Sequence, residues 1–303
     1  MSLFGALQEH AEDAAQEAAH GAEAGLTMEG LPDFISHHIG DAKDIEFAGQ
    51  HWSLEALSID PIHLGGLAID LSPTRQLVVM LFVAVMLPLI FIPVARMIRS
   101  KGVEKAPSGF ANSMEAMIIY FRDEVVRVNI GHGADAYTPF ILTLFFFILG
   151  MNLMGLTPLG ITPTANLSVT AALAIISFIV TEIAGMRALG PAGYARTIFF
   201  LPPGVPTLMK PFMLIVLSIV EALGKLTKPF ALAVRLLANM TAGHTLVLAI
   251  MGMIFVTQSY FMGVASVTAA SILMILELFV AFLQAYIFAM LTSVFIGLIR
   301  HAH

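Results

Sequence analysis

The chain has 303 residues, of which 58% are hydrophobic and only 12% charged, and its mean hydropathy is +0.86. A soluble domain carries roughly 25% charged residues, so a soluble fold of this length is not expected to hide so much apolar surface. The absence of cysteine excludes disulfides, thiolate metal sites and thiol nucleophiles. No basic patch with interleaved aromatic residues is present, which argues against nucleic-acid binding.

The first segment, residues 1–74, is polar and acidic. It explains the net charge of −6, because 13 of the 21 acidic residues lie within residues 1–75, against two basic residues, Lys43 and Arg75. It lacks the basic start and the long apolar core of a signal peptide. Six of the ten histidines fall within the first 63 residues. We expect them to be solvated, with a metal site among them as the weaker alternative.

Five apolar stretches follow, and each is long enough to cross a bilayer, which takes about 20 residues as a helix. They cover approximately residues 76–98, 137–157, 168–188, 206–256 and 260–299. The last two far exceed a hydrocarbon core of about 30 Å, so they predict a long, steeply tilted helical hairpin or, alternatively, broken helices. Residues 110–128 mix helically spaced apolar residues with charges, which predicts an amphipathic helix at the inner interface. The expected fold class is therefore an all-α membrane protein.

The basic residues indicate the orientation of these spans. Four of them lie at or just after the end of the first span and one follows the last span, namely Arg96, Arg99, Lys101, Lys105 and Arg300. The positive-inside rule then predicts five crossings, with the N-terminus outside and the C-terminus inside.

Three basic residues, Lys225, Lys228 and Arg235, remain inside the fourth apolar stretch, where a charge costs a few kcal/mol. They belong to a polar stripe whose steps of 4, 3, 7, 4 and 4 residues keep its members near one helix face, namely Glu221, Lys225, Lys228, Arg235, Asn239 and Gly243. Alanines on or near that face favour close approach of another protein surface. Alternatively, Glu221 and Lys225 neutralise each other, or the lysines extend to the interface.

Neither alternative explains Arg235. Its nearest acidic residue in the sequence is Glu221, 14 positions away, which is about 21 Å along a helix. An arginine does not lose its proton in a protein. Its counter-charge is therefore expected from another element or another chain.

A second polar group combines His244 with Glu277 and Gln284 of the last stretch. In a hairpin, His244 and Glu277 can approach each other, and both can titrate near neutral pH. A proton relay is one interpretation, and a buried structural pair is the other. Arg235 and His244 are nine positions apart and so point to opposite sides of their helix, an arrangement that suits a path better than a single cluster.

Residues 228–244, which read KPFALAVRLLANMTAGH, resemble the signature segment of subunit a of F-type ATP synthases. Three further segments resemble parts of the same family, namely residues 151–156, 163–170 and 283–288. The resemblance covers about residues 75–299 and leaves out the first 60 or so. Some bacterial members carry the acid at the position of His244 and the histidine at that of Glu277, whereas this chain has the opposite order, like mitochondrial members. Such an exchange preserves the chemistry of a contacting pair.

The resemblance implies a role for each matching residue. Arg235 matches the essential arginine that faces the carboxylates of a rotating c-ring, and Glu221 matches a carboxylate near the inner half-channel. Asn166 matches a polar position near the outer mouth. Four residues match polar positions that belong to the outer half-channel or to the surroundings of the arginine, namely Asn239, His244, Glu277 and Gln284. Lys225 and Lys228 are accessory.

The resemblance also implies the function, which is that of a stator subunit that translocates ions, expected to be protons, through two offset half-channels. Such a subunit is no enzyme by itself. The chain shows no P-loop, and no cofactor or metal is expected. The implied partners are the c-ring, the peripheral-stalk b subunits, indirectly the catalytic head, and the lipid bilayer of a bacterial inner membrane or an equivalent energy-transducing membrane. A secondary transporter that binds an anion through Arg235 is the alternative, but it predicts inverted repeats, and none is visible. An intramembrane hydrolase would need a nucleophile motif, which is absent.

Overall fold

The computed structural model describes residues 44–47, 50–53, 62–64, 67–69, 72–101, 109–157, 160–199, 206, 209–257 and 259–301. In the acidic N-terminal segment it shows two short antiparallel pairs of strands, which the sequence analysis did not predict. Strand β1 (Asp44–Phe47) pairs with β2 (Gln50–Ser53), and β3 (Ile62–Leu64) pairs with β4 (Leu67–Ile69). The side chains of the histidines in this segment lie outside the described residues.

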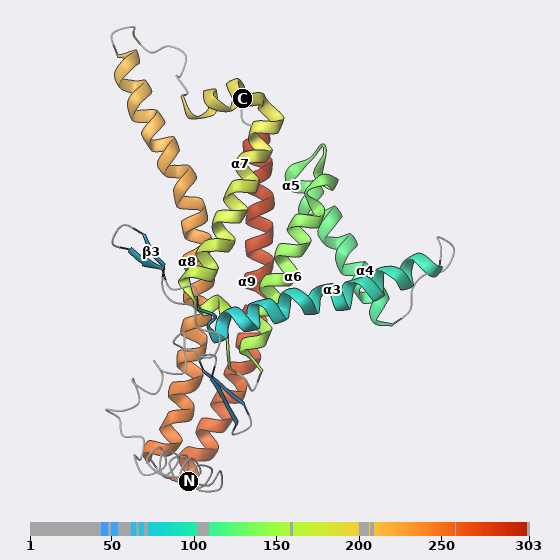
Figure 1. Ribbon diagram of the computed structural model, residues 1–303, viewed down its shortest axis with the longest axis vertical. Helices are drawn as coiled ribbons and strands as arrows, with labels where there is room; N and C mark the ends of the chain where they lie inside the picture. The colour runs from blue at the N-terminus through green and yellow to red at the C-terminus, as the bar shows by residue number, and fades with distance from the viewer. Residues whose placement is uncertain are drawn as a thin grey trace. The chain divides into compact units, whose positions relative to one another are not determined.

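Five long helices follow, and all five are long and apolar enough to cross a membrane. This confirms the all-α membrane fold that the apolar stretches predict. The helices are α3 (Arg75–Lys101), α6 (Thr138–Gly155), α7 (Leu167–Ile198), α8 (Lys210–Thr257) and α9 (Tyr260–Arg300) (Figure 1). Neither α8 nor α9 is interrupted, so the fourth and fifth stretches are continuous helices and the alternative of broken helices does not apply.

Helix α7 extends ten residues beyond the predicted end of the third span at residue 188. The added part follows a kink at Gly190, whose φ of 70° and ψ of 164° leave the helical region. Glycine adopts a positive φ without steric cost, and Pro191 is then suited to the first turn of the helical segment that follows. The helix therefore breaks and restarts just beyond the predicted end of the third span.

The segment predicted as an amphipathic helix at 110–128 contains α4 (Phe110–Tyr120), a π-helical stretch η2 (Phe121–Arg127) and α5 (Val128–Ile130). Phe121, Val125 and Val126 are buried, which shows that one side of this segment packs against the other helices. Its position at the inner interface of a membrane stays a prediction. Two short 3₁₀ turns, η3 (Ala134–Ala136) and η4 (Pro163–Ala165), precede α6 and α7.

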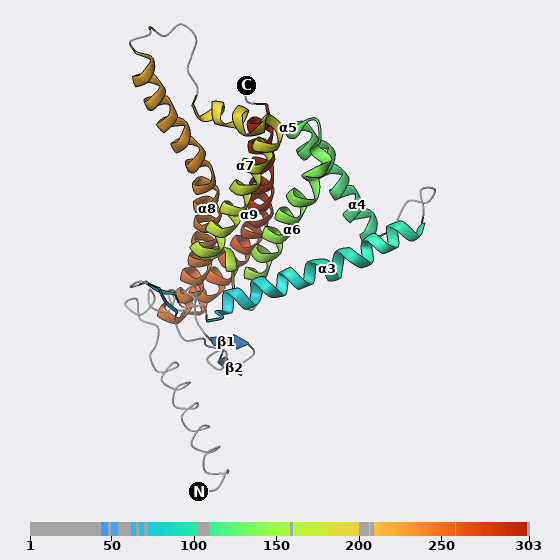
Figure 2. The same cartoon turned by 45° about the horizontal axis from the view of Figure 1, so that its top comes forward.

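The described helices divide into two compact units. One contains residues 242–277, which are the end of α8 and the beginning of α9, and the other contains the remaining helices together with residues 278–301 of α9. Within the second unit, α3 lies across the direction of α6 and α7 (Figures 1 and 2). At this crossing a Cβ on Gly150 would lie 2.8 Å from Val83 Cγ1, so the two helices approach closely because position 150 has no side chain.

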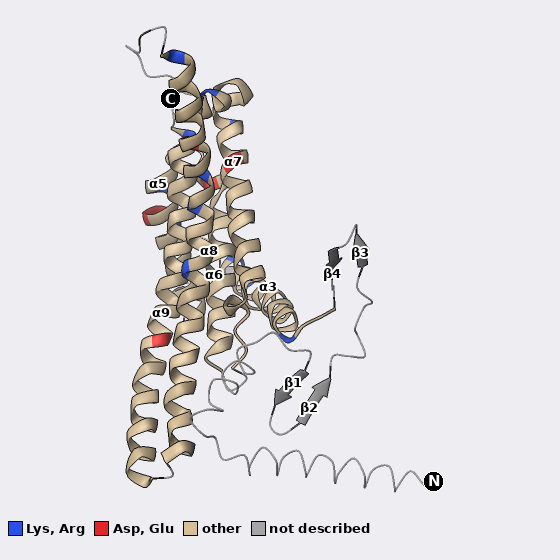
Figure 3. Ribbon diagram, turned by 90° about the vertical axis from the view of Figure 1, so that its left-hand side faces the viewer, with Lys and Arg blue, Asp and Glu red and all other residues tan. Residues whose placement is uncertain are grey.

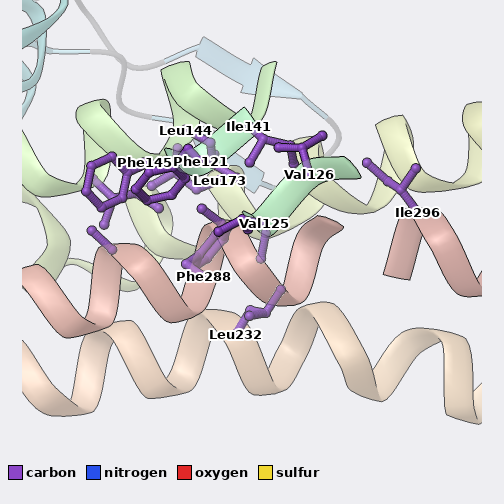
Figure 4. Packing of buried hydrophobic residues seen from close by; sticks show 14 of the residues in the cluster. Phe121, Val125, Val126, Ile141, Leu144, Phe145, Leu173, Leu232, Phe288 and Ile296 are labelled. Atoms are coloured by element: carbon purple, nitrogen blue, oxygen red, sulfur yellow. The ribbon is translucent and has the colours of Figure 1, made fainter. Parts of the chain in front are cut away.

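The core of the second unit is apolar and rich in aromatic rings (Figure 4). The ring of Phe121 lies 4.2 Å from that of Phe145 and 5.7 Å from that of Tyr286, measured between centroids. Leu232 of α8 and Phe288 of α9 belong to the same cluster. This packing fixes the four elements that carry these residues, namely η2, α6, α8 and α9. Most of the length of the long helices carries no charged residue (Figure 3), so the few exceptions define the candidate site.

Candidate functional site

His244 and Glu277 form a pair within the smaller unit, where α8 and α9 run side by side. His244 Nδ1 lies 2.9 Å from Glu277 Oε1, and the side chains are 14% and 7% exposed. The structure thus brings together the two residues that a hairpin was expected to bring together. A hydrogen bond between an imidazole and a carboxylate provides two adjacent groups that can each hold a proton.

Gly243 leaves the space that the Glu277 carboxylate occupies. A Cβ on this residue would lie 2.8 Å from Glu277 Oε1 and 3.0 Å from Cδ. These distances are shorter than ordinary van der Waals contacts, so the carboxylate lies directly against the backbone of α8. The glycine at the end of the predicted polar stripe therefore has a steric role that spacing alone does not reveal.

Arg235 lies on the exposed side of α8, together with the small residues Ala231 and Ala238. The opposite side of the helix is packed, since Ala233 and Met240 are 4% and 1% exposed. Within the part of the chain that the structure describes, Arg235 makes no ion pair or hydrogen bond. The guanidinium is paired neither with Glu221 nor with Glu277. The small side chains of the alanines beside it favour close approach of another helix.

Asn239 and Gln284 connect α8 and α9 within the larger unit. Asn239 Nδ2 donates a hydrogen bond of 2.9 Å to Gln284 Oε1. Gln284 is 2% exposed, and its buried Nε2 finds no acceptor among the described residues. A buried amide hydrogen without a partner costs about 1–3 kcal/mol, which is unusual outside functional sites.

Lys225 pairs with a residue that the sequence analysis did not single out. Its Nζ lies 3.6 Å from Glu182 Oε2 of α7, and the two side chains are only 11% and 14% exposed. Nζ also donates a hydrogen bond of 3.2 Å to the hydroxyl of Tyr194 and lies 4.2 Å from the centre of that ring. The charge of Lys225 is therefore balanced from α7, which differs from the alternative of an internal pair with Glu221.

A cavity of about 270 Å³ opens beside this pair. Glu182, Glu221, Lys225 and Lys228 all line it. Lys228 also lies 5.4 Å from the centre of the Phe295 ring, within the range of a cation–π contact. The two accessory lysines and the predicted inner carboxylate, Glu221, thus line the same cavity.

Asn166 precedes α7, and its Oδ1 accepts a hydrogen bond of 2.8 Å from the backbone N–H of Ser168. This is the arrangement of a helix N-cap, so the side chain has a local structural role at the position predicted for the outer mouth.

A fully buried asparagine, Asn152, was not recognised as a candidate. Its amide donates to the carbonyl of Ala281 at 3.2 Å, and its Oδ1 accepts from Thr164 at 2.7 Å. These bonds join α6, η4 and α9 within the larger unit. A second buried polar contact joins α7 to α9, where the hydroxyls of Ser177 and Thr292 lie 2.8 Å apart.

Glu182 could have been found from the sequence. An acidic residue inside an apolar span is a candidate functional residue by its position alone. The partner of Glu182 could not have been found in this way, because Lys225 lies 43 positions away on another helix. Among the described residues, no group of three or more histidine, aspartate or glutamate side chains is arranged to hold a metal ion.

Comparison with known proteins identifies the family. A sequence profile described as ATP synthase A chain matches residues 77–297, which include every candidate residue above. The chain belongs to the ATP synthase A chain family. Its relatives in this family include ATP synthase subunit a of Chloroherpeton thalassium, which is 42% identical over 98% of this chain and 86% of the relative. Subunit a of Anaeromyxobacter dehalogenans is 40% identical over 98% of this chain and 76% of the relative.

Membership of the ATP synthase A chain family agrees with the resemblance of residues 228–244. The five apolar helices together with the family establish a multi-pass membrane protein. The profile begins at residue 77, so the two pairs of strands lie outside the region that the family profile describes.

Proposed function

We propose that this chain is the ion-translocating subunit a of a rotary F-type ATP synthase and that it carries ions between the membrane surfaces and a c-ring through two offset half-channels. The observation that supports this most directly is Arg235, a permanent cation on the exposed side of an apolar helix that has no ion pair among the described residues. Family membership supplies the setting. The chain makes no ATP itself, and it acts as a non-catalytic part of the complex.

Arg235 would face the ring. A fixed guanidinium stabilises a deprotonated carboxylate that comes to rest opposite it and repels a cation that would otherwise pass directly between the half-channels. The exposed alanines at 231 and 238 leave room for close approach of a ring helix. An ion then has to bind to a ring carboxylate and travel around with the rotor. Moving one charge across the membrane provides about 2.3 kcal/mol per 100 mV for that rotation.

The outer half-channel would use His244 and Glu277, whose 2.9 Å contact allows a proton to move between them. Asn239 and Gln284 would orient groups near the arginine, and Asn166 lies at the start of α7 on the side assigned to the outer mouth. The inner half-channel would include Glu221, which is exposed and borders the cavity. The c-ring, the b subunits of the peripheral stalk and, indirectly, the catalytic head are the proposed partners, in a bacterial inner membrane with the C-terminus inside.

The test is the variant Arg235→Ala in inverted membrane vesicles that contain the assembled complex. We expect ATP-driven proton uptake to be lost while the complex is recovered in normal amounts, because assembly does not need the charge but transport does. Arg187→Ala removes an exposed arginine from α7 and is the matched control. Repeating the assay with and without sodium identifies the ion. Normal pumping by Arg235→Ala would refute the proposal.

A further inference from the structure

Glu182 lies in an unusual place for a carboxylate. It is on α7, a helix that is long and apolar enough to span a membrane, and its side chain is only 14% exposed. An ionisable group at such a depth costs several kcal/mol unless it is paired or reached by water. The only ion-pair partner of Glu182 among the described residues is Lys225.

The Glu182–Lys225 contact is loose. Its 3.6 Å separation exceeds the 2.7–2.9 Å that is usual when an ammonium donates directly to a carboxylate. Lys225 instead directs its hydrogen bond to the hydroxyl of Tyr194. The carboxylate of Glu182 therefore has its charge offset by Lys225 while its oxygens remain able to accept hydrogen bonds from water. A pair that served only to join α7 and α8 would be expected to make a direct hydrogen bond.

The neighbouring cavity has room for such water. Its volume of about 270 Å³ accommodates several molecules. Thr181 and Thr197 line it in addition to the charged side chains. Glu221 borders the same space from α8, one helical turn from Lys225. Two carboxylates on different helices, Glu182 and Glu221, thus line one cavity together with Lys225.

The cavity lies towards the basic ends of its helices. Its lining includes Leu298 and Ile299, which directly precede Arg300, and Thr197, which directly follows Arg196. Clusters of basic residues mark the inner surface by the positive-inside rule. The cavity therefore lies on the inner side of the membrane in the proposed topology.

We propose that Glu182 is a proton-exchanging residue of the inner access path, a role that rests on the proposed function of the chain. Its carboxylate takes a proton from a hydronium ion that leaves the rotor side, which gives a carboxylic acid and water. It then returns the proton to another water of the cavity, which restores the carboxylate and forms hydronium again. Lys225 balances the charged form, and Glu221 continues the path towards the inner surface.

The experiment compares three variants in the assembled complex. Glu182→Gln removes the exchangeable proton, and Glu182→Asp keeps a carboxylate. The double variant Glu182→Gln/Lys225→Met removes both charges, so it leaves no unpaired ammonium behind. Glu124→Gln, on the exposed side of η2, is the matched control for loss of one carboxylate. The assays are ATP-driven proton uptake and, in vesicles stripped of the catalytic head, passive proton conductance.

We expect Glu182→Gln and the double variant to lower both rates about a hundredfold, which is the lower end of the range for loss of a proton-transfer group. Glu182→Asp should recover part of the rate, and the amount of assembled complex should stay normal. Wild-type rates in Glu182→Gln, or recovery in the double variant, would overturn the proposal, because the pair would then be structural. The variant Arg235→Ala is measured alongside. If its ATP-driven proton uptake matches that of the wild type, the proposed function itself fails, whatever Glu182 does.

Discussion

Gly243→Ala tests whether the position of the Glu277 carboxylate matters. The added Cβ would lie 2.8 Å from Glu277 Oε1, 3.0 Å from Cδ and 3.4 Å from Cγ. The helix backbone cannot retreat easily, but the end of a glutamate side chain can. We therefore expect Glu277 to move away from α8 while the fold is kept.

The displacement weakens the bond to His244. Restoring an ordinary contact requires the carboxylate to retreat by about 0.5 Å, which lengthens the hydrogen bond from 2.9 Å to about 3.4 Å. A hydrogen bond to a charged group contributes about 1.5–3 kcal/mol, so losing roughly half of it costs about 1 kcal/mol. This corresponds to about fivefold fewer molecules in which the pair is formed.

The assay is ATP-driven proton uptake by vesicles, together with the thermal stability of the solubilised complex. We expect Gly243→Ala to lower uptake about fivefold and to change the melting temperature little. The matched control is Gly224→Ala on the same helix, where an added Cβ meets nothing within 4 Å. There alanine should support normal uptake. If Gly243→Ala also pumps normally, then the relay does not depend on the observed position of Glu277.

Two further predictions concern stability. Hydrogen bonds, first from Arg127 and then from Arg122, lower the pKa of Asp135 from 3.8 to about 2, so this carboxylate should stabilise the fold above pH 4 and lose that effect as the pH falls to 2. The difference in melting temperature between wild type and Asp135→Asn should therefore shrink over this range. A constant difference would contradict the assignment. Asn239→Leu removes the hydrogen-bond donor to the buried oxygen of Gln284 and should destabilise the protein by about 1–2 kcal/mol in chemical unfolding. Adding Gln284→Leu should recover most of that loss. No recovery would show that the loss of stability does not come from the Asn239–Gln284 hydrogen bond.

The five helices could be predicted because the apolar stretches are long and their ends carry clear signals. The hairpin contact was also accessible, since His244 and Glu277 lie at similar distances from the turn between α8 and α9. The resemblance of residues 228–244 to the signature segment predicted membership of the ATP synthase A chain family, and the family profile confirmed it.

Contacts between helices distant in sequence could not be predicted in this way. Periodicity places a residue on a face of its own helix and says nothing about the neighbour that the face meets. The pairing of Lys225 with Glu182 and the bonds of Asn152 are examples. The π-helical turn at Phe121–Arg127 was missed as well, because a single widened turn hardly changes the spacing of apolar residues.

Helix α8 has a consequence for the biogenesis of the protein. In its most apolar stretch only 11% of the residues are buried by the chain itself, against 50% in α6. An arginine on such a helix costs about 2.5–3.5 kcal/mol in a lipid environment. In a newly inserted copy, exposing this helix to lipid therefore costs free energy until another protein covers it. We expect cells that do not make the rotor to degrade the chain, so that its abundance follows the supply of its neighbour.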